Sequence, residues 1–280
     1  MGIQYGIKKD TDVFDYFSRA NISDPQAMKQ IANFVKRVKS LGIWNNFVCW
    51  MLINTQQGKS AGATSGTIYS LGGLGTYDAT VVNSLTIDSN GVTANGSVGY
   101  GYLVVANGAN LLAVNPVSSG AVYKTSGTTW GGGLAYWVFG NQYGATTNLT
   151  SGGWFREAVS VGLINQMRGE TLLNSLGTAN DQTSFCFFTN TTSSSASNNS
   201  LNYKNGSLST THTVGTTISP EPSGSDSYQF AAIPSYSTSG AFSGTTAFHF
   251  VIRNVLLSAT DILSLYNIYK STIGISIGLP

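Results

Sequence analysis

Residues 248–266, with the sequence FHFVIRNVLLSATDILSLY, decide the fold of this chain. The first part is rich in aromatic and branched apolar residues, which favour an extended strand, so we expect a strand over Ala247–Leu257. Ser258 with Asp261 three residues later is typical of a capping box, which predicts that a helix starts there. The apolar stripe of this helix is Ile262, Leu265, Tyr266 and Tyr269, and Gly274 lies just beyond its end.

A second helix is predicted near the other end of the chain. Asp24 is a good N-cap and Pro25 fits the first helical position. Gly42 is expected to end this helix. Its apolar stripe follows three- and four-residue spacing through Met28, Ile31, Phe34, Val35, Val38 and Leu41.

Short apolar runs fill most of the sequence between the two helices. Asn-Gly pairs at 90, 95, 107 and 205 separate several of them, and this pair is a strong signal for a hairpin turn. Many short strands with regular turns predict an all-β, antiparallel two-sheet sandwich. The expected strands are Trp44–Ile53, Val81–Ile87, Gly99–Val105, Leu111–Val114, Leu134–Phe139, Ala158–Ile164, Ser184–Phe188, Tyr228–Ile233 and Ala247–Leu257. The polar tract Thr189–Ser200 is interpreted as a long surface loop.

Two segments resemble domains of the concanavalin A and laminin-G type. Leu201–Leu208 (LNYKNGSL) resembles their hairpin, and residues 248–266 resemble their closing pattern, Ile-Arg-x-x-x-Leu-Ser followed by x-Glu/Asp-Ile-x-x-Leu-Tyr. The resemblance covers roughly residues 44–272. It implies a jelly-roll sandwich with one short helix before it and one after it.

The first part of the chain resembles the lead-in to such domains in bacteriophage structural proteins. The similar segments are DYFSRA at 15–20 and FVKRVKSLGIW at 34–44. This resemblance implies a non-catalytic virion subunit (capsid decoration, head fibre or tail-associated), made in the host cytoplasm and assembled with other virion proteins and with copies of itself. Residues 1–43 would then be a docking arm and helix, and residues 44–280 the sandwich.

The docking arm has two apolar segments that we expect to contact neighbouring subunits. An extended arm can add a strand to an exposed sheet edge. The expected interface residues are Ile3, Tyr5, Ile7, Val13, Phe14 and Phe17.

Composition excludes several classes of partner. Only 9% of the residues are charged, against roughly 25% in ordinary domains, and the net charge is +2. We therefore expect no nucleic-acid partner, and we interpret the cluster Lys36, Arg37 and Lys39 as a solvated helix face. No stretch approaches the ~20 apolar residues that would span a bilayer, and the first residues do not resemble a signal peptide.

The sequence offers little for catalysis, metals or cofactors, so we expect no enzyme. The Glu-x-Asp-x-x-Glu motif of related glycoside hydrolases is missing, and Glu157 and Glu170 are interpreted as partners of nearby arginines. Both histidines, His212 and His249, are interpreted as structural, and no zinc-ligand spacing occurs. The segment Asp88–Gly91 resembles a calcium loop only faintly, and a plain turn is favoured.

An alternative function is carbohydrate or receptor binding, with a host-surface glycan as the partner. Sugars stack on exposed aromatic rings, and the two best candidates are Trp130 and Trp154, each beside glycines. The two cysteines, Cys49 and Cys186, each lie within an apolar run, which favours buried free thiols over a disulfide.

Overall fold

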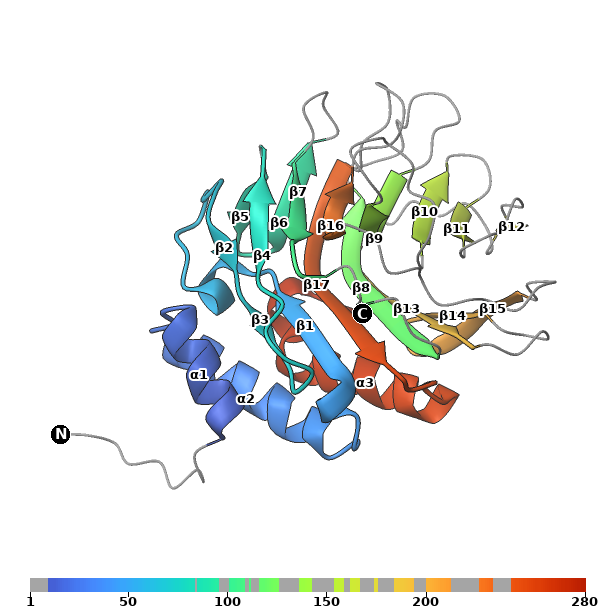
Figure 1. Ribbon diagram of the computed structural model, residues 1–280, viewed down its shortest axis with the longest axis horizontal. Coiled ribbons are helices and arrows are strands. Elements are labelled where there is room, and N and C mark those ends of the chain that lie inside the picture. Colours follow the sequence, from blue (N-terminus) through green and yellow to red (C-terminus); the bar gives the residue numbers. More distant parts are fainter. Residues whose placement is uncertain are drawn as a thin grey trace.

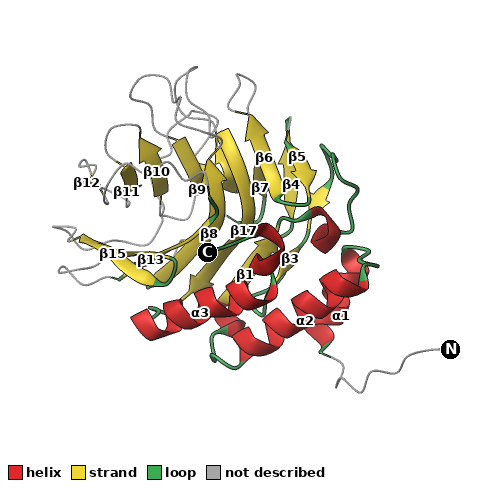
Figure 2. Ribbon diagram, turned by 180° about the vertical axis from the view of Figure 1, so that it is seen from behind, coloured by secondary structure: helices red, strands yellow, loops and turns green. Residues whose placement is uncertain are grey.

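The structure is a computed structural model that describes residues 10–83, 85–95, 101–108, 111, 116–125, 136–142, 154–158, 162–166, 174–175, 184–193, 200–212, 227–233 and 243–280. These residues form three layers, in which helices cover one face of a sheet and a second sheet covers the other face (Figures 1 and 2). We call the middle layer sheet A and the outer one sheet B.

All strand pairs in both sheets are antiparallel. In spatial order, sheet A contains β15 (Ser207–His212), β14 (Ser200–Lys204), β13 (Cys186–Thr192), β8 (Val117–Thr125), β17 (Ser243–Arg253), β1 (Phe47–Met51) and β3 (Ser70–Leu71), with β6 (Gly91–Asn95) also on β17 and β5 (Thr86–Asp88) on β6. Sheet B contains β12 (Asn174–Ser175), β11 (Gly162–Gln166), β10 (Trp154–Ala158), β9 (Tyr136–Gln142), β16 (Ser227–Ile233), β7 (Tyr102–Val105), β4 (Ala79–Val82) and β2 (Thr67–Ile68).

The helices of the described residues are α1 (Thr11–Arg19), α2 (Pro25–Lys39) and α3 (Ala259–Thr272), with short 3-10 turns η1 (Trp44–Asn46), η2 (Asn54–Gln57) and η3 (Gly274–Ile277). Two antiparallel sheets confirm the predicted β-sandwich. The jelly-roll strand order stays a prediction.

Alternate side chains of the central strands enter two different apolar clusters. Phe248 and Phe250 of β17 face the helices, while His249 and Val251 face sheet B. The side chains of β1 alternate between the same two clusters, and all five of its residues are buried. Because both faces of sheet A are covered here, β1 is apolar at every position instead of alternating apolar and polar residues.

Helices α2 and α3 start at the predicted caps. The Asp24 carboxylate accepts hydrogen bonds from the backbone of Gln26 and Ala27, at 2.8 and 2.9 Å. Ser258 and Asp261 form the predicted capping box. Both caps satisfy backbone groups that the first turn of a helix leaves open.

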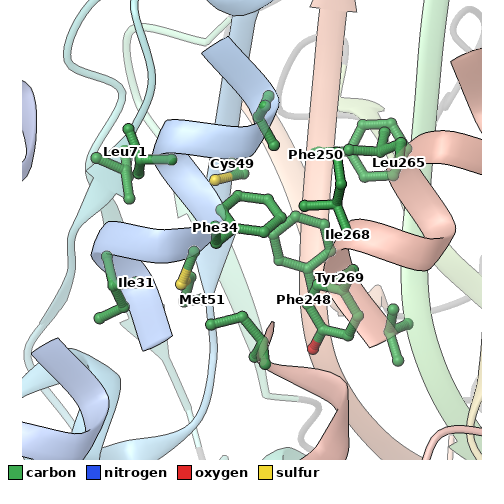
Figure 3. Packing of buried hydrophobic residues seen from close by; sticks show 14 of the residues in the cluster. Ile31, Phe34, Cys49, Met51, Leu71, Phe248, Phe250, Leu265, Ile268 and Tyr269 are labelled. Carbon is green, nitrogen blue, oxygen red and sulfur yellow. The ribbon is translucent and has the colours of Figure 1, made fainter. Parts of the chain in front are cut away.

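Aromatic rings hold α2 and α3 against sheet A. The Phe34 ring lies 5.7 Å from Phe248 and 6.3 Å from Tyr269, and the rings of Phe248 and Tyr269 are 4.5 Å apart. Figure 3 shows these three rings together between α2, α3 and the sheet. One apolar cluster therefore crosses the expected boundary between residues 43 and 44.

Helix α1 corrects the expectation that residues 13–17 form an extended arm. Val13, Tyr16 and Phe17 lie on one helix face and are buried in the chain's own core. The Tyr16 hydroxyl donates to the Gln56 carbonyl at 2.7 Å. Helix α1 also anchors the edge of sheet A, because the Arg19 guanidinium donates to the Ser70 carbonyl of β3 at 2.9 Å. The chain thus has two N-terminal helices where one was expected.

The predicted Asn-Gly hairpin at 205–206 is confirmed. It joins β14 to β15, and Asn205 and Gly206 have φ angles of 50° and 79°. Positive φ at both positions is what a tight two-residue hairpin requires. The turn rests on α3, since a Cβ atom on Gly206 would lie 2.8 Å from Leu263 Cδ1.

Three other expectations were wrong in detail. The single strand expected over Val81–Ile87 is the end of β4 in sheet B and the start of β5 in sheet A. The single strand expected over Ala158–Ile164 is the end of β10 and the start of β11, which pair with each other. The polar tract from Thr189 does not begin as a loop, because β13 continues to Thr192 and Thr189, Asn190 and Thr191 are buried. Cys49 and Cys186 are both buried and form no disulfide, as expected.

We expect Phe34→Ala to lower the free energy of unfolding by about 3 to 5 kcal/mol, since it opens a cavity where α2, α3 and sheet A meet. Chemical denaturation followed by circular dichroism measures this change. Phe14→Ala is the matched control, because Phe14 is also on a helix but is 44% exposed, and its cost should stay below about 1 kcal/mol. Equal losses in the two variants would contradict the packing described here.

Candidate functional site

The structure places the sequence-predicted interface residues in different environments. Val13 and Phe17 are buried within the chain, so a partner cannot reach them in this fold. Phe14 is exposed on α1. Ile3, Tyr5 and Ile7 lie outside the described residues.

The two sugar-stacking candidates are only partly covered by the structure. Trp154 is the first residue of β10, where its Cα pairs with Gln166 of β11. Its side chain and the whole of Trp130 lie outside what the structure describes. The structure therefore fixes where Trp154 enters sheet B and leaves sugar stacking as a prediction.

A row of polar side chains lies on the face of sheet A that is turned toward sheet B, and no pattern in the sequence predicted it. Ser119 of β8, Asn190 of β13 and Asn202 of β14 are consecutive cross-strand partners, and the row continues from Val251 of β17. Val251 belongs to the cluster between the sheets, and directly paired residues share a face. We call Ser119, Asn190 and Asn202 the amide row.

The amide row is fully buried and only partly satisfied. The exposures of Ser119, Asn190 and Asn202 are 2%, 1% and 0%. The Asn190 amide nitrogen donates to Asn202 Oδ1 at 2.9 Å and lies 3.4 Å from the Leu201 carbonyl. Asn202 Nδ2, in contrast, is a buried donor with no partner in the structure. Such a group costs about 1 to 3 kcal/mol of stability and therefore needs an explanation.

Next to the amide row, the centre of the sandwich contains a histidine among aromatic rings. His249 of β17 shares a hydrogen bond with the Tyr228 hydroxyl of β16, which links sheet A to sheet B. The imidazole stacks on Trp50 and Phe230, with ring centroids 5.5 and 4.7 Å away. Trp50 in turn donates its indole N–H to the Tyr77 carbonyl at 2.8 Å.

Burial lowers the pKa of His249 from its ordinary 6.5 to about 3, although a hydrogen bond with the Gly120 backbone acts in the opposite direction. The ring is therefore neutral near pH 7 and is completely enclosed. An enclosed imidazole cannot reach an outside substrate, and a pKa of about 3 makes it a poor general base near pH 7. This environment supports the structural interpretation of His249.

The described residues contain no metal site and no membrane-spanning helix. In these parts of the chain, no three His, Cys, Asp or Glu side chains gather closely enough to hold an ion. At 88–91 the chain makes a turn between β5 and β6, in which the Asn90 backbone donates to Asp88 Oδ1 at 2.8 Å. None of the described helices is long and apolar enough to cross a bilayer.

The carboxylates considered for catalysis are not both described. Glu157 lies in β10, with its Cα paired to Leu163 and to Tyr136, and Glu170 lies outside the described residues. Their expected pairing with arginines stays a prediction.

Comparison with known proteins identifies the fold and no family. No protein-family model and no curated protein matches the chain. Similar solved structures include a sialidase of Trypanosoma rangeli, with 12% identity and a TM-score of 0.53 over 88% of this chain and 40% of that chain. They also include a structure of botulinum neurotoxin type C, a toxin whose cell entry is described as dependent on interaction with two ganglioside molecules. Its identity to this chain is 17%, with a TM-score of 0.53 over 81% of this chain and 52% of that one. The binding domain of botulinum neurotoxin serotype D is similar too, with 14% identity, a TM-score of 0.54 and the same coverage.

These similarities establish the β-sandwich architecture. The chain spans only about half, or less, of each of these three structures. They include both an enzyme and binding domains, and none of them is described as a phage protein.

The neutral state of His249 predicts a specific loss of stability in acid. The unfolded chain takes up a proton near its ordinary pKa of 6.5, whereas the folded chain does not until about 3. The free energy of unfolding should therefore fall as the pH drops through this window, by up to about 1.4 kcal/mol per pH unit. Denaturation series at several pH values, above the range in which carboxylates titrate, measure this slope.

The matched control is His249→Gln, which keeps a hydrogen-bonding group for Tyr228 and removes the titration. This variant should have a flatter dependence on pH in the same window. If wild type and variant lose stability in parallel, the buried neutral state of His249 is wrong.

Proposed function

We propose that this chain is a non-catalytic carbohydrate-binding module that uses the amide row to recognise sugar hydroxyls. The observation that carries the proposal is the unpaired amide nitrogen of Asn202, a donor held between the two sheets beside Asn190 and Ser119. Amide and hydroxyl groups can donate and accept hydrogen bonds, as sugar hydroxyls do. A few such groups within an otherwise apolar site fix the orientation of a ligand.

The position of the amide row supports this function. It lies on β8, β13 and β14, toward the end of sheet A where β10, β11 and β12 form the corresponding end of sheet B (Figure 1). Strand β10 starts with Trp154, one of the two residues expected to stack on sugars. A sugar would enter between the sheets at this end. Entry requires the sheets to part there, because the amide row is covered in the free chain.

The fold also supports this function, because similar sandwiches occur in a toxin binding domain and in a structure concerned with ganglioside interaction. At identities of 12 to 17%, the similarity concerns architecture alone, so glycan binding by this chain rests on its own residues.

The virion role expected from the lead-in resemblance stays a second prediction. Its support is the similarity of residues 15–44 to the lead-in of phage structural proteins. In the structure this segment forms most of α1 and all of α2, which pack on sheet A. No comparison adds support for a virion location or for capsid and tail partners.

Asn202→Leu should weaken glycan binding by about tenfold, equal to about 1.4 kcal/mol, because the variant loses a donor to the sugar. Its free energy of unfolding should change little, since the variant removes the unsatisfied Asn202 Nδ2 but also the Oδ1 that accepts from Asn190. An array of sialylated and neutral oligosaccharides identifies the glycan, and calorimetric titration measures the affinity. Trp154→Ala should weaken the same interaction through lost stacking.

The matched control is Thr246→Val, which removes a hydroxyl that is also fully buried and unpaired, but on the part of β17 that pairs with β6. Its glycan affinity should equal that of the wild type. Two results would reject the proposal: no binding to any glycan on the array, or an affinity that Asn202→Leu leaves unchanged.

A further inference from the structure

Sheet A ends at β15 in an edge strand that no other described strand covers. At the opposite end of the strand order the edge is β3, which has only two residues and is anchored by Arg19 of α1. β15 is six residues long and carries exposed side chains at Ser207, Leu208 and Ser209. An uncovered edge of this length presents backbone donors and acceptors that can pair with another chain.

Two exposed leucines border this edge on its helix-covered side. Leu208 is the cross-strand partner of Tyr203, whose side chain is in the cluster beneath the helices, so both lie on that face. Leu263 of α3 lies beside the Gly206 turn that leads into β15. Their exposures are 54% and 45%, which is unusual for leucines beside a core. We call β15, Leu208 and Leu263 the β15 edge.

Turn geometry shows which backbone groups of the β15 edge point outward. In a two-residue hairpin the pair flanking the turn, here Lys204 and Ser207, exchanges both hydrogen bonds. The next pair, Tyr203 and Leu208, is then a non-hydrogen-bonded one, and the backbone N–H and C=O of Leu208 point away from β14. The exposed leucine side chain and the outward backbone groups therefore belong to the same residue.

We propose that the β15 edge binds residues 3–7 of a second copy of this chain as an added antiparallel strand. This segment, Ile3-Gln-Tyr-Gly-Ile7, alternates apolar and other residues with the period of a strand. One face of the added strand would place its apolar side chains against Leu208 and Leu263, which removes the exposed apolar surface. This proposal is independent of glycan binding.

Distance requires the segment to come from another copy. Asp10, where α1 starts, is held by Lys39 at 2.8 Å, and Lys39 also contacts Asp12, which accepts from Trp44 just before β1. From β1 to β15 the sheet order crosses five strand spacings, about 24 Å in total. Lys8 and Lys9 extend over only about 10 Å up to Asp10, so the chain's own segment cannot reach β15 with residues 3–7 paired.

Sedimentation or light scattering over a range of concentrations measures the assembly. The wild-type chain should self-associate, whereas deletion of residues 1–9 and the variant Leu208→Lys should each be monomeric. Lysine on the edge blocks strand addition. Ile275→Lys is the matched control, because Ile275 is also an exposed apolar residue, at 69%, but lies in η3 after α3, and this variant should associate like the wild type.

Mixing the two monomeric variants gives the decisive result. The deletion variant keeps an intact β15 edge, and Leu208→Lys keeps an intact segment, so an equimolar mixture should form a one-to-one complex that grows no further. A wild-type chain that stays monomeric, variants that associate as the wild type does, or a mixture with no complex would each overturn the proposal. Circular dichroism confirms that both variants remain folded.

Discussion

The burial of both faces of sheet A is the constraint on which the rest of the structure depends. Successive residues of β1 and β17 face the helices and sheet B in turn, so each strand contributes apolar side chains to both clusters. Phe34, Phe248 and Tyr269 satisfy one side, and Trp50 with His249 satisfies the other. The helices are therefore part of the core and are not an appendage that precedes it.

This constraint decides where binding can occur. The helix-covered face of sheet A is occupied by the chain's own side chains, and the centre of the sandwich is filled by His249 and its aromatic neighbours. Farther out on the same face of sheet A, the buried side chains of Asn190 and Asn202 carry polar amides. The amide row and the β15 edge, which are the two proposed binding sites, thus lie at the same end of the molecule, away from its apolar centre.

Caps and turns set by a few neighbouring residues were predictable, whereas helix α1 and the features set by long-range pairing were missed. The caps at Asp24 and Ser258 and the turn at Asn205 each depend on a few neighbouring residues, and all are confirmed. Helix α1 was missed because its aromatic residues favour strands, although the spacing of Val13, Tyr16 and Phe17 would have indicated a helix. The amide row exists only through the register of β8, β13 and β14, which the sequence alone does not specify.

Native-state hydrogen exchange, resolved by residue, tests the central claim most directly, namely that helices and sheet A form one cooperative unit. Amides of Ile31–Val38 in α2 and of His249–Val251 in β17 should exchange only through global unfolding, with the same free energy of opening. If the α2 amides open with a much lower free energy than those of β17, the helices fold separately from the sheet and the account is contradicted.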